Sequence, residues 1–90
     1  MKVKVTQEHI NKGIKRDCNK CPIALAILNR KNILYIRVDN KNVLILRKVK
    51  DKKEQSLYLL PYAAVNFIKD FDLAKEVKPF SFEMKKKNED

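Results

Sequence analysis

The sequence predicts an α+β domain: a small antiparallel sheet of three to four strands, with about three helices packed on one face. Two observations predict this class. Short segments with alternating or β-branched apolar residues occur near both ends and in the middle of the chain, and helix-start signals precede three other segments. Ninety residues suffice for one domain. We assign it to residues 1–84 and expect the charged tail, residues 85–90, to fray.

The first elements are a strand and a short helix. Residues 2–5 alternate lysine with valine, which predicts a strand with Val3 and Val5 on one face. Thr6 is a good N-cap, and Gly13 is a typical residue after a helix end, so residues 7–12 are predicted to be helical. A polar loop follows. Pro22 then suits the first turn of a second helix over 22–30, which is apolar on nearly all sides and therefore expected to be buried.

The middle of the chain predicts a β-hairpin. Residues 33–38 and 43–50 are β-branched and apolar, and residues 39–42 between them suit a tight turn because Asn tolerates positive φ. With Asn40 and Lys41 as loop residues, Val38 would face Val43 and Ile36 would face Ile45.

The last third predicts a helix and a strand. Residues 51–55 are interpreted as a solvated turn or hairpin tip, and residues 56–60 as a third strand or a segment crossing the core. Pro61 precedes a helix over 62–74, in which Ala64, Phe67, Ile68 and Phe71 recur with helical spacing. Alternation in residues 80–84 predicts a strand. The predicted order is β-α-α-β-β-(β)-α-β.

Positive charge is concentrated in the first part of the chain. Residues 1–55 carry 15 Lys and Arg against 5 Asp and Glu, whereas residues 56–90 carry 6 of each. A concentrated positive field favours a nucleic acid or an acidic protein surface as partner.

Several function classes lack their sequence signatures. No Gly-rich phosphate loop, complete catalytic constellation, signal peptide or membrane-length apolar segment is present. These absences favour a non-enzymatic cytoplasmic protein without a membrane partner. An exposed sheet edge would permit a homodimer.

Cys18 and Cys21 form a Cys-x-x-Cys motif directly before the second predicted helix. A helix N-terminus can lower a cysteine pKa, so a redox site is one interpretation. Zinc is another, with Cys18, Cys21 and His9 as candidate ligands, or with two protomers each supplying both cysteines. Structural cysteines, or an opportunistic disulfide between them, are the third interpretation, which we favour.

Basic residues form three groups: around the first loop, after the second helix, and along the hairpin. We predict that nucleic acid or a nucleoprotein complex contacts a basic lobe built from the first loop and the hairpin. The candidate contact residues are Lys15, Arg16, Lys20, Arg47, Lys48 and Lys50. Tyr35 and Tyr58 are candidate base-stacking residues if their side chains are exposed. The alternative is a protein-interaction module, such as a phage-encoded inhibitor of a host enzyme or defence system.

Two parts of the chain carry a recognisable pattern: His9-Ile10 before Gly13, then a helix of sequence Cys-Pro-Ile-Ala-Leu-Ala over residues 21–26, and Phe71-Asp72 before Pro79-Phe80. The chain resembles a family of short, uncharacterised proteins of bacteria and their phages with this pattern. The resemblance implies that His9, Asp17, Cys21 and Pro22 belong to one structural unit, and that the protein is an accessory of a phage or mobile element.

Overall fold

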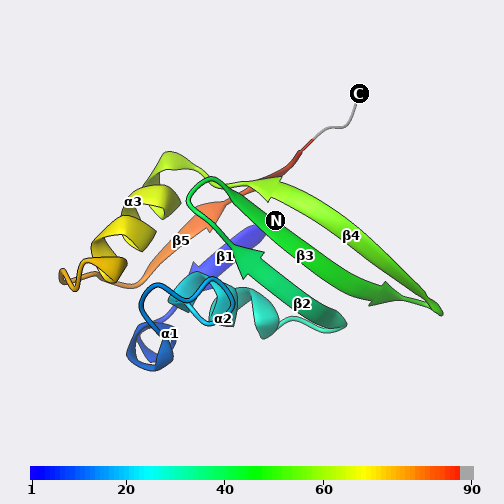
Figure 1. The fold of residues 1–90 in the computed structure, drawn as a ribbon, viewed down its shortest axis with the longest axis horizontal. Coiled ribbons are helices and arrows are strands. Elements are labelled where there is room, and N and C mark those ends of the chain that lie inside the picture. Colours follow the sequence, from blue (N-terminus) through cyan, green and yellow to red (C-terminus); the bar gives the residue numbers. More distant parts are fainter. Residues whose placement is uncertain (88–90) are drawn as a thin grey trace.

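The computed structural model describes residues 1–87 and has an α+β fold, which confirms the predicted class (Figure 1). Within these residues, three helices accompany six strands in two antiparallel sheets. The single predicted sheet is thus divided in two. Strands β2, β3, β4 and β6 form a four-stranded sheet in that order, and β1 pairs with β5 separately. No helix in the described part of the chain is long and apolar enough to cross a membrane.

The two-stranded sheet joins the ends of the chain. Strand β1 (Lys2–Val5) pairs with β5 (Phe80–Glu83), which places Val3 opposite Phe82. Val3, Val5 and Phe82 are buried, as their alternation predicts. A long-range pair of this kind is not encoded locally, because each strand alone is compatible with either sheet.

Helix α1 (Gln7–Lys12) begins where Thr6 caps it. The Thr6 hydroxyl accepts a hydrogen bond from the His9 backbone N–H at 3.3 Å, and His9 Nδ1 accepts one from the Thr6 N–H at 3.0 Å. This is a capping box with histidine in the reciprocal position. Gly13 follows the helix end as predicted, but its φ of −65° is not in the left-handed region that favours glycine. A Cβ at Gly13 would instead lie 2.6 Å from the Pro22 ring, and close packing explains the glycine.

Helix α2 (Pro22–Leu28) lies between the two sheets and contacts both β1 and β2. Its residues Ile23, Ala24 and Ile27 are completely buried. The helix ends two residues earlier than predicted, at the capping residue Asn29. These three residues share one side of the helix, whereas Leu25 and Ala26 are half-buried and Leu28 is exposed, so the expected burial on nearly all sides is confirmed only in part.

Strand β2 (Ile33–Val38) pairs with β3 (Asn42–Val49) in the predicted register, with Val38 opposite Val43 and Ile36 opposite Ile45. The turn differs from expectation, because Asn40 does not have a positive φ. Its geometry is held by Asp39, whose Oδ1 accepts hydrogen bonds from the backbone N–H groups of Lys41 and Asn42 at 2.8 and 2.6 Å.

Strand β4 (Lys52–Leu59) is longer than predicted and pairs with β3 along its whole length. The turn consists of Lys50, which has φ 57°, and Asp51. Lys52 to Gln55 were predicted to be a turn or hairpin tip, but they extend the strand because backbone pairing with β3 tolerates polar side chains at the solvated end of a hairpin. Figure 1 shows this β3–β4 hairpin projecting beyond the helices.

Helix α3 (Tyr62–Asp72) shows the predicted apolar face, with Ala64, Phe67 and Phe71 buried. The Phe67 ring stacks on Phe80 of β5 at a centroid distance of 4.7 Å. The helix therefore packs through its aromatic face against the two-stranded sheet.

The C-terminal lysines depart from the expected frayed tail. Strand β6 (Lys85–Lys86) pairs with β4, with Lys85 opposite Leu59 and Lys86 opposite Tyr58. The buried Met84 side chain anchors the segment immediately before this strand. Residues 88–90 of the predicted tail lie outside the described residues.

The four-stranded sheet has partly covered edges. At the β2 edge, the Val38 N–H donates to the Cys18 carbonyl at 2.8 Å, and the Asn19 amide donates to the Ile36 carbonyl at 2.7 Å. At the opposite edge, β6 covers only the end of β4. The predicted homodimer through a sheet edge stays a prediction.

Candidate nucleic-acid interface

The two faces of the four-stranded sheet differ in burial. On the inner face, Ile36, Val38, Val43, Ile45 and Tyr58 are buried. Their strand neighbours point to the opposite, outer face because side chains alternate along a strand. None of these neighbours is buried, so the outer face is not covered by another part of the described chain.

The outer face combines apolar and cationic side chains. Its centre consists of four leucines, of which Leu44, Leu46 and Leu57 are half-buried and Leu59 is exposed. Tyr35 lies opposite Leu46 and is 44% exposed. The cations of this face, placed by strand register and all exposed, are Arg37, Lys48, Lys53 and Lys85.

Within residues 1–87, no carboxylate belongs to the outer face. Strands β2, β3, β4 and β6 contain a single acidic residue, Glu54, and its partner in the register is Arg47 on the inner face. The ion pairs in the described chain join Lys12 to Glu8 and the N-terminal amino group to Glu83, both away from this surface. The outer face is therefore cationic without internal neutralisation.

Lys48 and Lys53 are directly opposite each other on β3 and β4. Like charges at directly opposed positions of an antiparallel pair are destabilising. No acidic residue of the sheet shares their face. An anionic partner would relieve the repulsion between them, so the pair favours anion binding at this end of the sheet.

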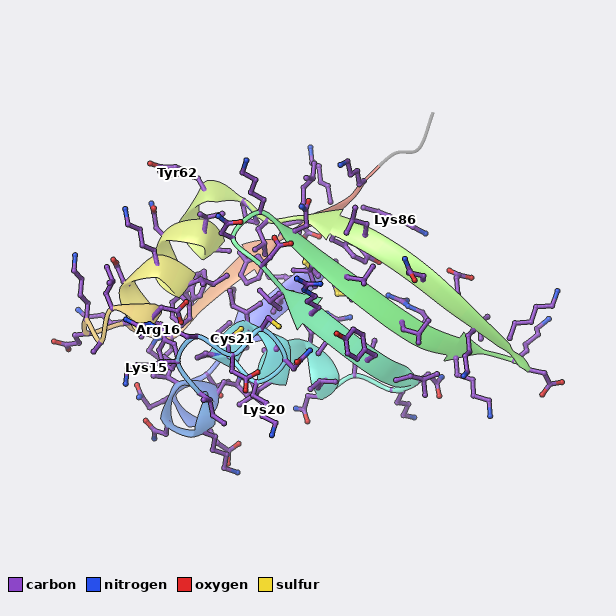
Figure 2. All side chains as sticks on the ribbon, viewed as in Figure 1. Lys15, Arg16, Lys20, Cys21, Tyr62 and Lys86 are labelled. Carbon is purple, nitrogen blue, oxygen red and sulfur yellow. The ribbon has the colours of Figure 1, made fainter. Side chains whose placement is uncertain are left out.

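The structure does not bring the six predicted contact residues together on one surface. Lys15, Arg16 and Lys20 lie on the loop between α1 and α2, whereas Arg47, Lys48 and Lys50 belong to the β3–β4 hairpin. Figure 2 shows the first three on the side of the molecule opposite to the tip of that hairpin. The molecule measures 41 Å along its longest axis. The predicted basic lobe therefore consists of two separate surfaces.

Arg47 and Lys48 also point in opposite directions, since they are neighbours on one strand. Arg47 is on the inner face, half-buried, and donates a hydrogen bond to the Tyr58 hydroxyl at 3.3 Å. Tyr58 is itself buried, so it is not available to stack on a base. Of the two candidate tyrosines, only Tyr35 is accessible.

The first-loop group has acidic neighbours. The Arg16 backbone N–H donates to Asp72 Oδ1 at 2.9 Å, and Asp17 Oδ1 accepts from the N–H groups of Asn19 and Lys20 at 2.9 and 3.1 Å. The Lys15 ammonium lies 5.6 Å from the centroid of the Phe71 ring. These contacts fix the loop against α3 and reduce its net positive field.

Cys21 has a structural role. Its sulfur caps α2 by accepting a hydrogen bond from the Ala24 N–H at 3.5 Å. Burial raises the pKa of the Cys21 thiol to about 11, although the backbone N–H groups of Ala24 and Ile23 act in the opposite direction. The redox interpretation requires a lowered thiol pKa, and for Cys21 the direction is the opposite because loss of solvation outweighs the hydrogen bonds.

Cys18 is half-buried and, like Cys21, is a free thiol. Both line a cavity of about 310 Å³ that Arg16, Asp39 and Asp72 also border. Among residues 1–87, no group of three or more His, Cys, Asp or Glu side chains is arranged to hold a metal ion. His9 belongs to the capping box of α1, so it is not brought together with the cysteines as a third ligand.

We expect the two thiols to react at very different rates. At about pH 8, the Cys21 thiol would be ionised in roughly one molecule in a thousand, and its burial further slows attack. Iodoacetamide should therefore modify Cys18 in the native protein and both cysteines in urea, as mass spectrometry would measure. Cys18→Ser should leave almost no native labelling. Rapid labelling of that variant would contradict the structural role of Cys21.

A further basic surface, beside β1, was not predicted from the sequence. Lys2, Lys4, His9 and Arg30 line a cavity of about 350 Å³ beside β1, and the Arg30 guanidinium donates a hydrogen bond to the Lys2 carbonyl. The alternation of residues 2–5 placed both lysines on one face, but only the fold brings the end of α2 beside them.

Arg37, Lys53 and Lys85 on the outer face were also missed. A signal was present in the sequence: leucines at positions 44, 46, 57 and 59 alternate with buried residues, so both faces of the hairpin are apolar. The position of Lys85 depends on the pairing of β6 with β4, which has no local signal.

Comparison of the chain with protein-family models, with curated proteins and with solved structures finds no match. The resemblance to a family of short bacterial and phage proteins stays a prediction.

Proposed function

We propose that this protein is a non-enzymatic nucleic-acid-binding protein that uses the outer face of its four-stranded sheet. The observation that carries the proposal is the uncovered face with four cations, an accessible tyrosine and, among residues 1–87, no carboxylate. Cations that are not neutralised within the protein release counterions from a phosphate backbone when they contact it. The net charge of +10 adds long-range attraction for the same partner.

Charge reversal on this face should weaken binding more than an equal reversal elsewhere. In the variant Lys48→Glu/Lys53→Glu, we expect loss of two phosphate contacts and a slope of log K against log salt reduced by about 1.4 for a single strand or about 1.8 for a duplex. The control is Lys75→Glu/Lys78→Glu, which makes the same change in net charge at exposed positions between α3 and β5. Fluorescence anisotropy over a salt series, with labelled DNA and RNA, measures both quantities.

The two double variants separate a local interface from a general charge effect. Reversal of both Lys48 and Lys53 again opposes like charges, now two carboxylates, across the same pair of strands. Thermal stability should therefore stay near that of the parent, so that loss of binding cannot be attributed to unfolding. Equal weakening by both variants would show that the positive charge acts without a defined surface, and would contradict the proposal.

The second candidate function is a protein-interaction module with an acidic partner. The four leucines at the centre of the outer face favour it, because an apolar centre with a charged rim is typical of protein interfaces. Nuclease treatment of a pull-down distinguishes the two functions. Partners bound through nucleic acid are lost on treatment, whereas a directly bound acidic protein is retained and requires Leu44 and Leu57.

A further inference from the structure

We infer that the outer face binds single-stranded rather than duplex nucleic acid, an inference that rests on the proposed function. The relevant feature is the mixture of side chains on the face. Tyr35 and Leu59 are exposed, and Leu44, Leu46 and Leu57 are half-exposed, in the same surface as the cations. A single strand presents unstacked base faces together with phosphates, so it can contact both kinds of side chain.

A duplex matches this surface less well. Its exterior consists of phosphates and sugars, and its bases are reached by an element that enters a groove. The leucines lie in the middle of the sheet rather than at the tip of the β3–β4 hairpin, with Leu44 opposite Leu57 and Leu46 opposite Gln55. Contact with a duplex through the face would leave these apolar side chains against phosphates.

The cations are placed at both ends of the apolar centre. Lys85 of β6 lies opposite Leu59 of β4, and Leu59 lies opposite Asn42 at the start of β3. Lys48 and Lys53 lie toward the other end of the β3–β4 hairpin. Lys48 lies six positions after Asn42 on β3, which corresponds to roughly 20 Å along the strand. A strand of nucleic acid following the sheet would contact phosphate-binding side chains at each end and apolar side chains between them.

Tyr35 provides the stacking position. It lies on the edge strand β2, opposite Leu46, and Arg37 follows two residues later on the same face. An aromatic ring beside a guanidinium suits a base and its adjoining phosphate. Tyr35 is the exposed tyrosine of this face, since Tyr58 is buried and Tyr62 belongs to α3.

The first experiment compares single strands and duplexes of identical mixed sequence, as DNA and as RNA, by anisotropy over a salt series. We expect the single strand to bind at least about 10-fold more tightly, with a slope of log K against log salt near −3 because four cations contact phosphates at about 0.7 counterions each. Equal or tighter binding of the duplex would overturn this inference and leave the proposed function standing. Absence of binding to every nucleic acid, with tight binding of polyglutamate, would overturn both.

The second experiment tests the stacking position with matched aromatic variants. Tyr35→Ala should weaken single-strand binding about 10-fold or more, whereas Tyr35→Phe should retain it because the ring is kept. The control is Tyr62→Ala, which removes a tyrosine that is 80% exposed but lies outside the face. Equal affinities of Tyr35→Ala and Tyr62→Ala would remove Tyr35 from the interface and overturn the inference. Thermal melting verifies that each variant is folded.

Discussion

Replacement of Ile23 by alanine is expected to lower the free energy of unfolding by about 2–5 kcal/mol. Ile23 is completely buried on α2, the helix that contacts both β1 and β2. Removing its side chain leaves a cavity in the core where α2 packs against a strand of each sheet. For a domain of this size the loss is a large part of a total of roughly 5–13 kcal/mol.

Chemical denaturation followed by circular dichroism measures this change. The control is Leu28→Ala on the same helix, because Leu28 is 38% exposed and its loss should cost much less. Similar destabilisation by the two variants would contradict the position of α2 between the sheets.

Replacement of Gly13 by alanine is expected to destabilise the fold by about 1–3 kcal/mol. The φ angle of −65° is accessible to alanine, and reduced freedom of the unfolded chain would by itself stabilise the protein. The new Cβ would, however, lie 2.6 Å from two carbons of the Pro22 ring and 2.9 Å from its nitrogen. We expect this overlap with the ring and backbone of Pro22 to outweigh the entropic gain, so the substitution lowers the free energy of unfolding.

A double-mutant cycle with Pro22→Ala tests this contact. Removal of the ring carbons should reduce the cost of Gly13→Ala, while the contact with the backbone nitrogen retains part of it. The melting temperature should fall by several degrees in Gly13→Ala, at about 4–8 °C per kcal/mol for a domain of this size. An unchanged or raised melting temperature would contradict the close packing of the first loop on α2.

Neither substitution involves the outer face of the sheet, so stability and binding can be altered separately. The Lys48–Lys53 pair belongs to the proposed binding surface rather than to the core. It opposes like charges across two strands, and we propose that an anionic ligand compensates for this arrangement. Ile23 and Gly13 instead position α2 and the first loop, on which the sheet depends for its inner packing.

Local patterns in the sequence were sufficient to predict most of the helices and strands. Thr6 and Pro22 marked helix starts because capping depends on neighbouring backbone groups, and the Val38–Val43 register followed from the length of the turn. The turn beyond Val49 was placed wrongly, since polar residues at the end of a hairpin have no strand signal until the opposite strand pairs with them. The same reason explains why Lys85 and Lys86 were expected to fray.

The sequence by itself determined the α+β class, the helix caps, the central hairpin and the excess of positive charge. These properties depend on residue type and on neighbours close along the chain. Only the tertiary structure decided that β1 pairs with β5 apart from the main sheet, that the two basic groups are separate, and that Lys48, Lys53 and Lys85 share one uncovered face. Such juxtapositions depend on strand pairing between distant segments, which local propensity does not specify.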